Sequence, residues 1–347
     1  MDKNRLIEIC NNLGIDTVGI APVGPYTELK KILIDRNEKQ YLTGMEEEDI
    51  EKRTNPKLIM EDAKSIIVCA FPYYAGEYED TNLSKYCYGE DYHIVTKQIL
   101  NEVCLQIENE IPEFKYEIFA DNGPLVDRYL AYLSGIGYFG INNNIITDKY
   151  GSYVFIAYIV NNYDFEKDIP LDKTCLKCNK CVKACPGNAL LGNFEIDPRK
   201  CLSYITQKKE ELSEQEEDAL RKNKKVFGCD ICQDICPHNK NIEVTNFQTN
   251  NEGEFVDKIH EAYLEGYDGV MLNAGAWTHY SHAIGDALRM LECPVIELHM
   301  SNVHAREEFR HHSVISPIAS GIIVGLGSSV YTLGLRAFDD IFRGNND

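Results

Sequence analysis

The chain has 347 residues, of which 44% are hydrophobic, and it carries a formal net charge of −20. This length allows two domains or more. The acidic balance argues against broad nonspecific binding to nucleic acid, which depends on Lys and Arg neutralising phosphates. The N-terminal segment lacks the pattern of a secretion signal, and no uncharged stretch reaches the ~20 residues that span a bilayer. We therefore expect a cytoplasmic protein with no membrane association.

The first half of the chain alternates between strand-like and helix-like segments. Short apolar runs rich in β-branched or aromatic residues, as buried strands are, occur at 65–71, 116–120 and 153–160. A helical stretch at 91–110 separates the first two runs. This alternation predicts an α/β domain over residues 1–171.

The next region, residues 172–240, is dominated by cysteines and turns. Because the cytosol keeps thiols reduced, a cysteine cluster here is better explained by metal binding than by disulfides. The run C-x2-C-x2-C-x3-C-P, which starts at Cys175, binds one [4Fe-4S] cluster through three thiolates and reaches a second cluster with the fourth. The crossed arrangement of two-cluster ferredoxins then assigns Cys175, Cys178, Cys181 and Cys236 to one cluster, and Cys185, Cys201, Cys229 and Cys232 to the other.

This ligand count is complete for two [4Fe-4S] clusters in a ferredoxin-like insert. The alternative is a pair of four-cysteine zinc sites, which have no need of the three-thiolate run that closes on Cys and Pro. A polar helix near 207–224 also carries Lys and Arg among acidic residues. A solvated surface of mixed charge is the simpler interpretation of that helix.

After residue 240 the pattern becomes regular again. Strand-like segments at 243–249, 269–275, 294–300 and 321–327 alternate with helix-like segments at 252–266, 281–291 and 330–342. Strands that alternate with helices of this length indicate βαβ units and a parallel sheet. We expect a third domain over residues 241–347.

The first two regions resemble the epoxyqueuosine reductase family. The resemblance is carried by SIIVCAFPYY, SKYCYGEDYH, ADNGPLVDRYLAYLSGIGYFGINNN and the cysteine segments, so that it covers about residues 1–240. Members of that family depend on cobalamin and complete the queuosine base at a tRNA wobble position. The resemblance implies a cobalamin-binding α/β domain, a tRNA substrate and an electron donor protein.

Two site residues follow from this resemblance. Asp121 matches the family's proton donor to the epoxide oxygen, and Arg53 matches a position that contacts the cofactor. Epoxide removal requires a reductant relay and a positioned acid, which agrees with this assignment in kind. From its sequence neighbours alone, Asp121 would equally be a turn or helix-capping residue.

The third region resembles the type II 3-dehydroquinate dehydratases, which are flavodoxin-like enzymes of the shikimate pathway. The segments GVMLNAGAWTHYSHAIGDAL and VIELHMSNVHAREEFRHHS carry this resemblance. Loss of water from a β-hydroxy ketone needs a base, an acid and enolate stabilisation. The resemblance implies homo-oligomer formation through this domain, an acid at His299 oriented by Glu297, and substrate contacts at Asn273, His279, Asp286, Ser301, Arg306 and Arg310.

This third region lacks the family's beginning. The missing segment is a first strand followed by a mobile loop that carries an essential Arg and the catalytic Tyr. We therefore expect a parallel-sheet domain without its first strand.

Three hypotheses follow from these resemblances. The first is a working reductase with a vestigial C-terminal domain, which the complete set of cluster ligands favours. The second is a dehydratase whose base comes from elsewhere, such as another subunit. The third is an inactive product of an in-frame fusion between two genes.

Overall fold

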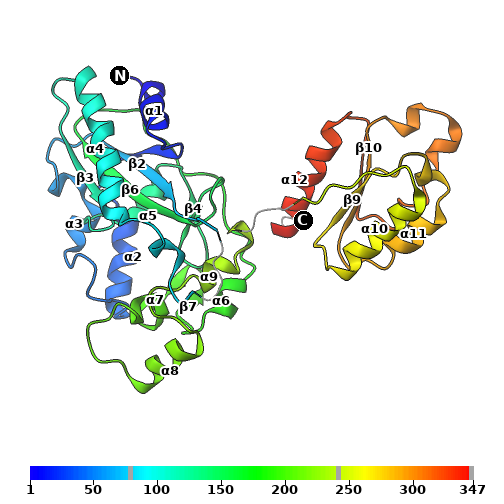
Figure 1. The fold of residues 1–347 in the computed structure, drawn as a ribbon. Helices are drawn as coiled ribbons and strands as arrows, with labels where there is room; N and C mark the ends of the chain where they lie inside the picture. The colour runs from blue at the N-terminus through cyan, green and yellow to red at the C-terminus, as the bar shows by residue number, and fades with distance from the viewer. Residues whose placement is uncertain (77–80, 240–243, 344–347) are drawn as a thin grey trace. The chain divides into compact units, whose positions relative to one another are not determined.

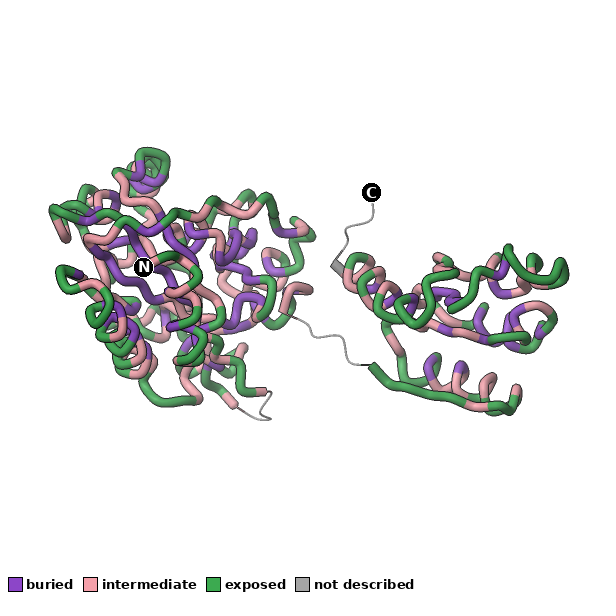
Figure 2. The backbone as a smooth tube through the Cα atoms, turned by 90° about the horizontal axis from the view of Figure 1, so that it is seen from above, coloured by how far each residue is buried: buried purple, intermediate pink, exposed green. Residues whose placement is uncertain are grey.

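The computed structural model describes residues 1–76, 81–239 and 244–343. The chain divides into two compact units, Met1–Lys240 and Asn241–Asp347, and each is described by itself (Figure 1). Figure 2 shows buried residues inside both units. Each unit therefore has its own core.

The first unit is built on a four-stranded antiparallel sheet. The order of its strands is β1 (Val18–Pro22), β2 (Ser65–Pro72), β6 (Val154–Asn161) and β3 (Tyr116–Ala120). The central pair holds Cys69 opposite Ala157. The predicted strands at 65–71, 116–120 and 153–160 are all present.

Helices cover both faces of this sheet, as Figure 1 shows. Alternate residues of β2 point to opposite faces, so that Ile67 and Cys69 belong to one core cluster while Ile66 and Val68 belong to another. One face is covered by α1 (Lys3–Asn12) and α4 (Tyr92–Glu110), and the other by α2 (Thr27–Glu38) and α5 (Asp127–Leu133). This three-layer arrangement is the α/β fold that the sequence predicts.

The cysteine-rich part of the unit consists of short elements, because it offers few apolar residues from which longer ones could build a core. Its largest helix, α8 (Glu214–Lys222), begins with a capping box between Ser213 and Glu216. Its other elements are α6 (Lys180–Ala184), the hairpin β7 (Leu190–Gly192) and β8 (Glu195–Ile196), α7 (Leu202–Ile205), α9 (Ile231–Asp234), and 3₁₀ turns at Pro198–Lys200 and Pro237–Asn239. Short elements outside this part are α3 (Ile50–Thr54), the hairpin β4 (Tyr138–Phe139) and β5 (Ile145–Ile146), and 3₁₀ turns at Pro56–Leu58 and Lys85–Cys87.

The second unit has a three-stranded parallel sheet, as the alternating pattern predicts. Its order is β11 (Gly321–Val324), β10 (Val295–His299) and β9 (Val270–Leu272). The helices α10 (Glu252–Leu264) and α11 (His282–Leu288) pack on one face, and α12 (Ser329–Arg343) packs on the other. Short 3₁₀ turns lie at Gly275–His279, Val303–Ala305 and Glu308–His311.

The strand predicted at 243–249 is wrong for the residues that can be described. Residues 244–249 form no strand, and Val244 and Phe247 are exposed; residue 243 lies outside the described part. In the flavodoxin-like order 2-1-3-4-5 the second strand pairs only with the first. Because the first strand is missing, the second has no neighbour with which to form hydrogen bonds.

Candidate functional site

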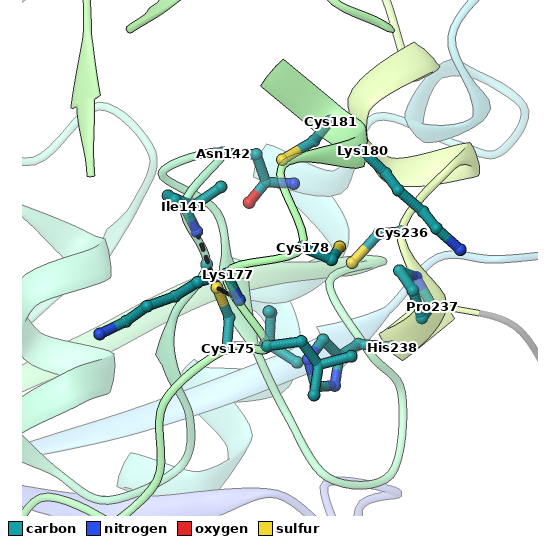
Figure 3. A pocket seen from close by; sticks show the side chains of 13 residues that line it. Ile141, Asn142, Cys175, Lys177, Cys178, Lys180, Cys181, Cys236, Pro237 and His238 are labelled. Atoms are coloured by element: carbon teal, nitrogen blue, oxygen red, sulfur yellow. Dashed lines mark hydrogen bonds between the residues drawn. The ribbon is translucent and has the colours of Figure 1, made fainter. Parts of the chain in front are cut away.

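The first predicted set of cysteines surrounds one cavity. Cys175, Cys178, Cys181 and Cys236 all line it, together with the tip of the β4–β5 hairpin. Figure 3 shows their sulfur atoms facing the same space from two segments of the chain, one with Cys175, Cys178 and Cys181 and the other with Cys236. Burial, and then the neighbouring thiol of Cys236, raise the pKa of Cys181 to about 11.

The cysteines of the second predicted set also lie close enough together to affect one another's pKa. Burial raises the pKa of the Cys232 thiol well above its usual range, and the thiols of Cys201, Cys229 and Cys185 raise it further. Gly187 permits part of this approach, because a Cβ at that position would lie 1.9 Å from the carbonyl oxygen of Lys200. A glycine therefore lets the Cys185 segment lie directly against the segment that carries Cys201.

The thiols surround their sites and do not converge on one point. Among the residues that the structure describes, no three His, Cys, Asp or Glu side chains lie close enough together to hold a single metal ion. A zinc ion would need its sulfurs about 2.3 Å from one centre, whereas the thiolates of a [4Fe-4S] cluster bind different irons. The donor set fits two iron–sulfur clusters, although the assignment of each cysteine stays a prediction.

The loop between β4 and β5, Gly140–Asn144, connects both thiol sets. The backbone N–H of Ile141 donates to Cys175 Sγ at 3.3 Å. The Asn144 side chain donates from Nδ2 to Cys232 Sγ at 3.9 Å. On its other side, the carbonyl oxygen of Asn143 accepts from Arg128 Nη1 at 2.7 Å. This loop is therefore the structural link between the cysteines and α5.

Asp121 directly follows β3 and is solvent-exposed. Its φ of +61° lies in the left-handed region, which Asp tolerates better than most residues and which is often found at functional sites. Its Oδ2 accepts from the Tyr92 hydroxyl at 3.0 Å and lies 3.2 Å from His93 Nε2. Both partners end the segment SKYCYGEDYH, which carries part of the family resemblance but did not predict a role for either residue.

Asp127 and Arg128, at the start of α5, were also missed as site residues. Burial, and then the charge of Asp121, raise the pKa of Asp127 well above its usual range, and its buried Oδ1 has no hydrogen-bond partner within the described residues. Burial lowers the pKa of Arg128, although the residue is partly open to solvent. The charge of Arg128 also lowers the pKa of Cys201, against the larger effect of burial.

Arg53 lies on α3 and is partly buried. Burial lowers its pKa, the carboxylate of Glu46 opposes this shift, and Arg36 adds to it. Arg36 in turn lines a cavity of about 420 Å³ together with Asn143 and Phe194. A cavity of this volume lies within the range of small-molecule sites, and its wall has mixed charge, with Lys31 and Arg36 beside Asp35 and Glu195.

The C-terminal unit brings together some of its predicted residues. Asn273 follows β9 and His299 ends the adjacent parallel strand β10, so that both lie at the same edge of the sheet. His299 Nε2 lies 2.9 Å from the buried carboxylate of Glu297. The rings of His299 and His279 are 6.5 Å apart and nearly parallel, and His279 Nδ1 bonds the carbonyl oxygen of His312 at 2.7 Å.

Other predicted residues of this unit are exposed or form local ion pairs. Asp286 is exposed on α11 and pairs with Arg289 at 3.9 Å. Arg306 and Arg310 both pair with Glu307, at 3.5 Å and 2.8 Å, and Ser301 is exposed. The unit thus presents a histidine pair with an orienting carboxylate, and the roles of the other residues stay predictions.

Family models match three parts of the chain. The model described as 4Fe-4S double cluster binding domain matches residues 174–239, and the model of epoxyqueuosine reductase QueG matches 53–122. Dehydroquinase class II matches residues 222–339 and overlaps the cluster domain. The first unit is therefore an iron–sulfur α/β protein.

Curated relatives define the family more closely. The epoxyqueuosine reductase of Bacillus anthracis is 36% identical over 254 residues, which cover 70% of this chain and 66% of the relative. That of Lactococcus garvieae is 35% identical over 248 residues, which cover 69% of this chain and 70% of the relative. The chain belongs to the epoxyqueuosine reductase family. It spans about two thirds of the length of these relatives.

Solved structures agree with this membership. Epoxyqueuosine reductase from Streptococcus thermophilus superposes with a TM-score of 0.66 at 29% identity, covering 82% of this chain and 80% of that one. A second epoxyqueuosine reductase, bound to an epoxyqueuosine-modified tRNA-Tyr stem loop, gives a TM-score of 0.64 at 33% identity, with 70% of this chain and 66% of that one covered. No described helix is long and apolar enough to cross a membrane.

Proposed function

We propose that the first unit reduces epoxyqueuosine in tRNA to queuosine. The observation that carries this proposal is the loop Gly140–Asn144, which contacts both thiol sets and the Arg128 side chain. The residue before Arg128, Asp127, lies close enough to Asp121 for the Asp121 charge to raise its pKa. The proposed electron carriers and the proposed proton donor thus belong to one unit.

Reduction of an epoxide requires both electron carriers and a proton donor. Opening an epoxide to an alkene consumes two electrons and two protons, and the oxygen leaves as water. Iron–sulfur clusters carry electrons one at a time, so that a centre able to deliver a pair is needed, and cobalamin would supply that chemistry at its cobalt. Asp121 would donate a proton to the epoxide oxygen. Arg53, Arg36 and Arg128 would bind anionic groups of the cofactor or of the tRNA.

The proposed partners follow from the same assignment. An electron donor protein would reduce the clusters, and the tRNA wobble base would bind beside Asp121. Because the proposed cluster ligands are thiolates, a reducing compartment such as the cytoplasm suits the protein. The cations of α8 are paired within the helix, as in Lys222 with Asp218, so that α8 is not our proposed tRNA contact.

Anaerobic reconstitution followed by turnover tests this function. We expect about eight irons per chain, a change in the cobalamin absorption spectrum on titration, and queuosine formation on an epoxyqueuosine-modified stem loop. Asp121→Asn should keep the irons and abolish turnover, while Glu117→Gln, an exposed control on β3, should match the unmodified protein. Two zincs per chain, or full turnover by Asp121→Asn, would refute the proposal.

A second candidate function is dehydration of 3-dehydroquinate by the C-terminal unit. The buried pair of Glu297 and His299 favours it, because a carboxylate beside a histidine fixes the orientation of an acid or base. The segment that would carry the catalytic Tyr is missing, so that a base would have to come from another subunit of a homo-oligomer. Activity on 3-dehydroquinate that His299→Ala abolishes would establish this function. Inactivity in both assays would favour the fusion product without activity.

A further inference from the structure

The proposed proton donor, Asp121, is the end of a chain of polar contacts. Turnover by the proposed reaction consumes two protons, and one carboxyl group holds only one. Asp121 must therefore regain a proton at least once per turnover, or a second donor must act. Its immediate partners show which group can supply that proton.

Two donors converge on the same oxygen of Asp121. Tyr92 donates its hydroxyl to Oδ2 at 3.0 Å, and His93 Nε2 lies 3.2 Å from that oxygen. The other oxygen, Oδ1, has no hydrogen-bond partner within the described residues and remains open to a substrate. One oxygen thus faces the protein's own donors while the other can face the reacting group.

His93 is held in one orientation by Asp91, which caps α4. Asp91 Oδ1 accepts from the backbone N–H of His93 at 2.9 Å and bonds its ring Nδ1 at 2.7 Å. These hydrogen bonds from His93 lower the pKa of Asp91, so that it remains an ionised acceptor. An imidazole that donates Nδ1–H to Asp91 presents Nε2 to Asp121, and this is the nitrogen that must gain and lose a proton.

Tyr92 cannot take the same role. Its ring stacks on Phe155, with centroids 3.8 Å apart and planes 4° apart, and burial, followed by the charge of Asp121, raises its pKa. The phenol therefore stays protonated and only holds Asp121 in place. A histidine is the side chain whose ordinary pKa allows it to exchange protons near neutral pH.

We propose that His93 returns a proton to Asp121, with Asp91 as the residue that positions the imidazole. This inference rests on the proposed reductase function. The imidazolium of His93 donates its Nε2–H to Oδ2 of the Asp121 carboxylate, and the carboxyl group turns about its Cβ–Cγ bond. The O–H then passes its proton to the substrate oxygen. The neutral imidazole regains a proton at Nε2 from water, which reaches it because the His93 side chain is 30% exposed. One proton moves in each step and no electron moves.

Few charged groups surround this relay. Asp91 precedes α4, Tyr92 begins it, and Asp121 follows β3. Asp127, at the start of α5, acts electrostatically on both Tyr92 and Asp121. Tyr86 also acts electrostatically on Tyr92, and the uncharged ring of Phe155 on β6 stacks against Tyr92.

The test compares His93→Gln and Asp91→Asn with Glu90→Gln, an exposed neighbour, in the reconstituted full-length chain. We expect His93→Gln to lower kcat by about 10²-fold or more, the usual share of acid–base catalysis, with KM, iron content and cobalamin absorption unchanged. Added imidazole should restore part of the rate. Asp91→Asn should shift the pH profile of kcat, and Glu90→Gln should change nothing.

The outcomes separate this inference from the function on which it rests. Absence of turnover by the unmodified protein refutes the reductase function and the relay together. Normal turnover by His93→Gln beside an active unmodified protein refutes the relay alone. A loss that imidazole does not restore, or that comes with lost iron, assigns His93 a structural role and also refutes the relay.

Discussion

The buried carboxylate of Glu297 offers a direct measure of how much the C-terminal unit depends on its histidine site. Glu297 is 1% exposed and accepts hydrogen bonds from His299 at 2.9 Å, from Ser313 at 2.9 Å and from Ser316. Glu297→Ala leaves these donors unpaired in the core. Removing one partner of a buried ionic contact costs about 3–5 kcal/mol, and we expect Glu297→Ala to lower the free energy of unfolding of this unit by that amount.

Urea unfolding followed by tryptophan fluorescence measures this loss in the full chain. The protein has one tryptophan, Trp277, which packs against Phe255 inside the C-terminal unit, so that its emission reports on that unit. The matched control is Glu307→Gln, because Glu307 is more than half exposed and solvent screens its ion pairs, so that its replacement should change the free energy of unfolding far less. A loss below about 1 kcal/mol for Glu297→Ala would refute the assignment of a charged, fully bonded Glu297.

The loss of stability caused by Glu297→Ala should depend on pH. Burial raises the pKa of Glu297, but the hydrogen bonds from His299, Ser316 and Ser313 lower it more, so that the net shift is below the ordinary 4.5. A carboxyl with a depressed folded-state pKa stabilises the fold above its unfolded pKa and loses this effect as the pH falls through the folded one. The difference between Glu297→Ala and the unmodified protein should therefore be constant near neutral pH and shrink below pH 4.5.

Three further predictions concern the cysteine sites. Gly187→Ala places a Cβ against the Lys200 carbonyl, so iron analysis should show loss of about four of eight irons; a full complement would contradict the close approach. Cys178→Ala should remove the first cluster and leave the spectrum of the second, whereas loss of both would show that they assemble together. Asn144→Leu removes a donor to Cys232 and should lower that cluster's reduction potential, as redox titration followed by EPR can show; an unchanged potential would exclude the hydrogen bond.

The sequence predicted most of the fold, because buried strands carry a strong local pattern. The runs at 65–71, 116–120 and 153–160 became β2, β3 and β6, and the helix–strand alternation after 252 became a parallel sheet. The exception, 243–249, has the composition of a strand. Composition could not reveal that the neighbouring strand is missing, since pairing is a property of two segments.

The candidate site was predictable to different extents. Cysteine spacing alone indicated two clusters, because ligands three residues apart must share a centre. The partners of Asp121 could not be derived in this way, since Tyr92 and His93 begin a helix some 30 residues earlier and meet it only through the fold. Arg128 reaches Asn143 through a similar tertiary contact.

The second thiol run lies at the end of the first unit, just before the chain changes from one family to the other. Cys236 lies among the last residues of that unit, and the segment after it is fixed by Asn239. The Asn239 side chain accepts from the backbone N–H of Ser152 at 2.6 Å and donates to the carbonyl oxygen of Gln233 at 2.8 Å. Gly151 allows this contact, because a Cβ there would lie 2.1 Å from Asn239 Oδ1. The last described residues of the first unit are therefore held by contacts within that unit, just before its boundary at Lys240.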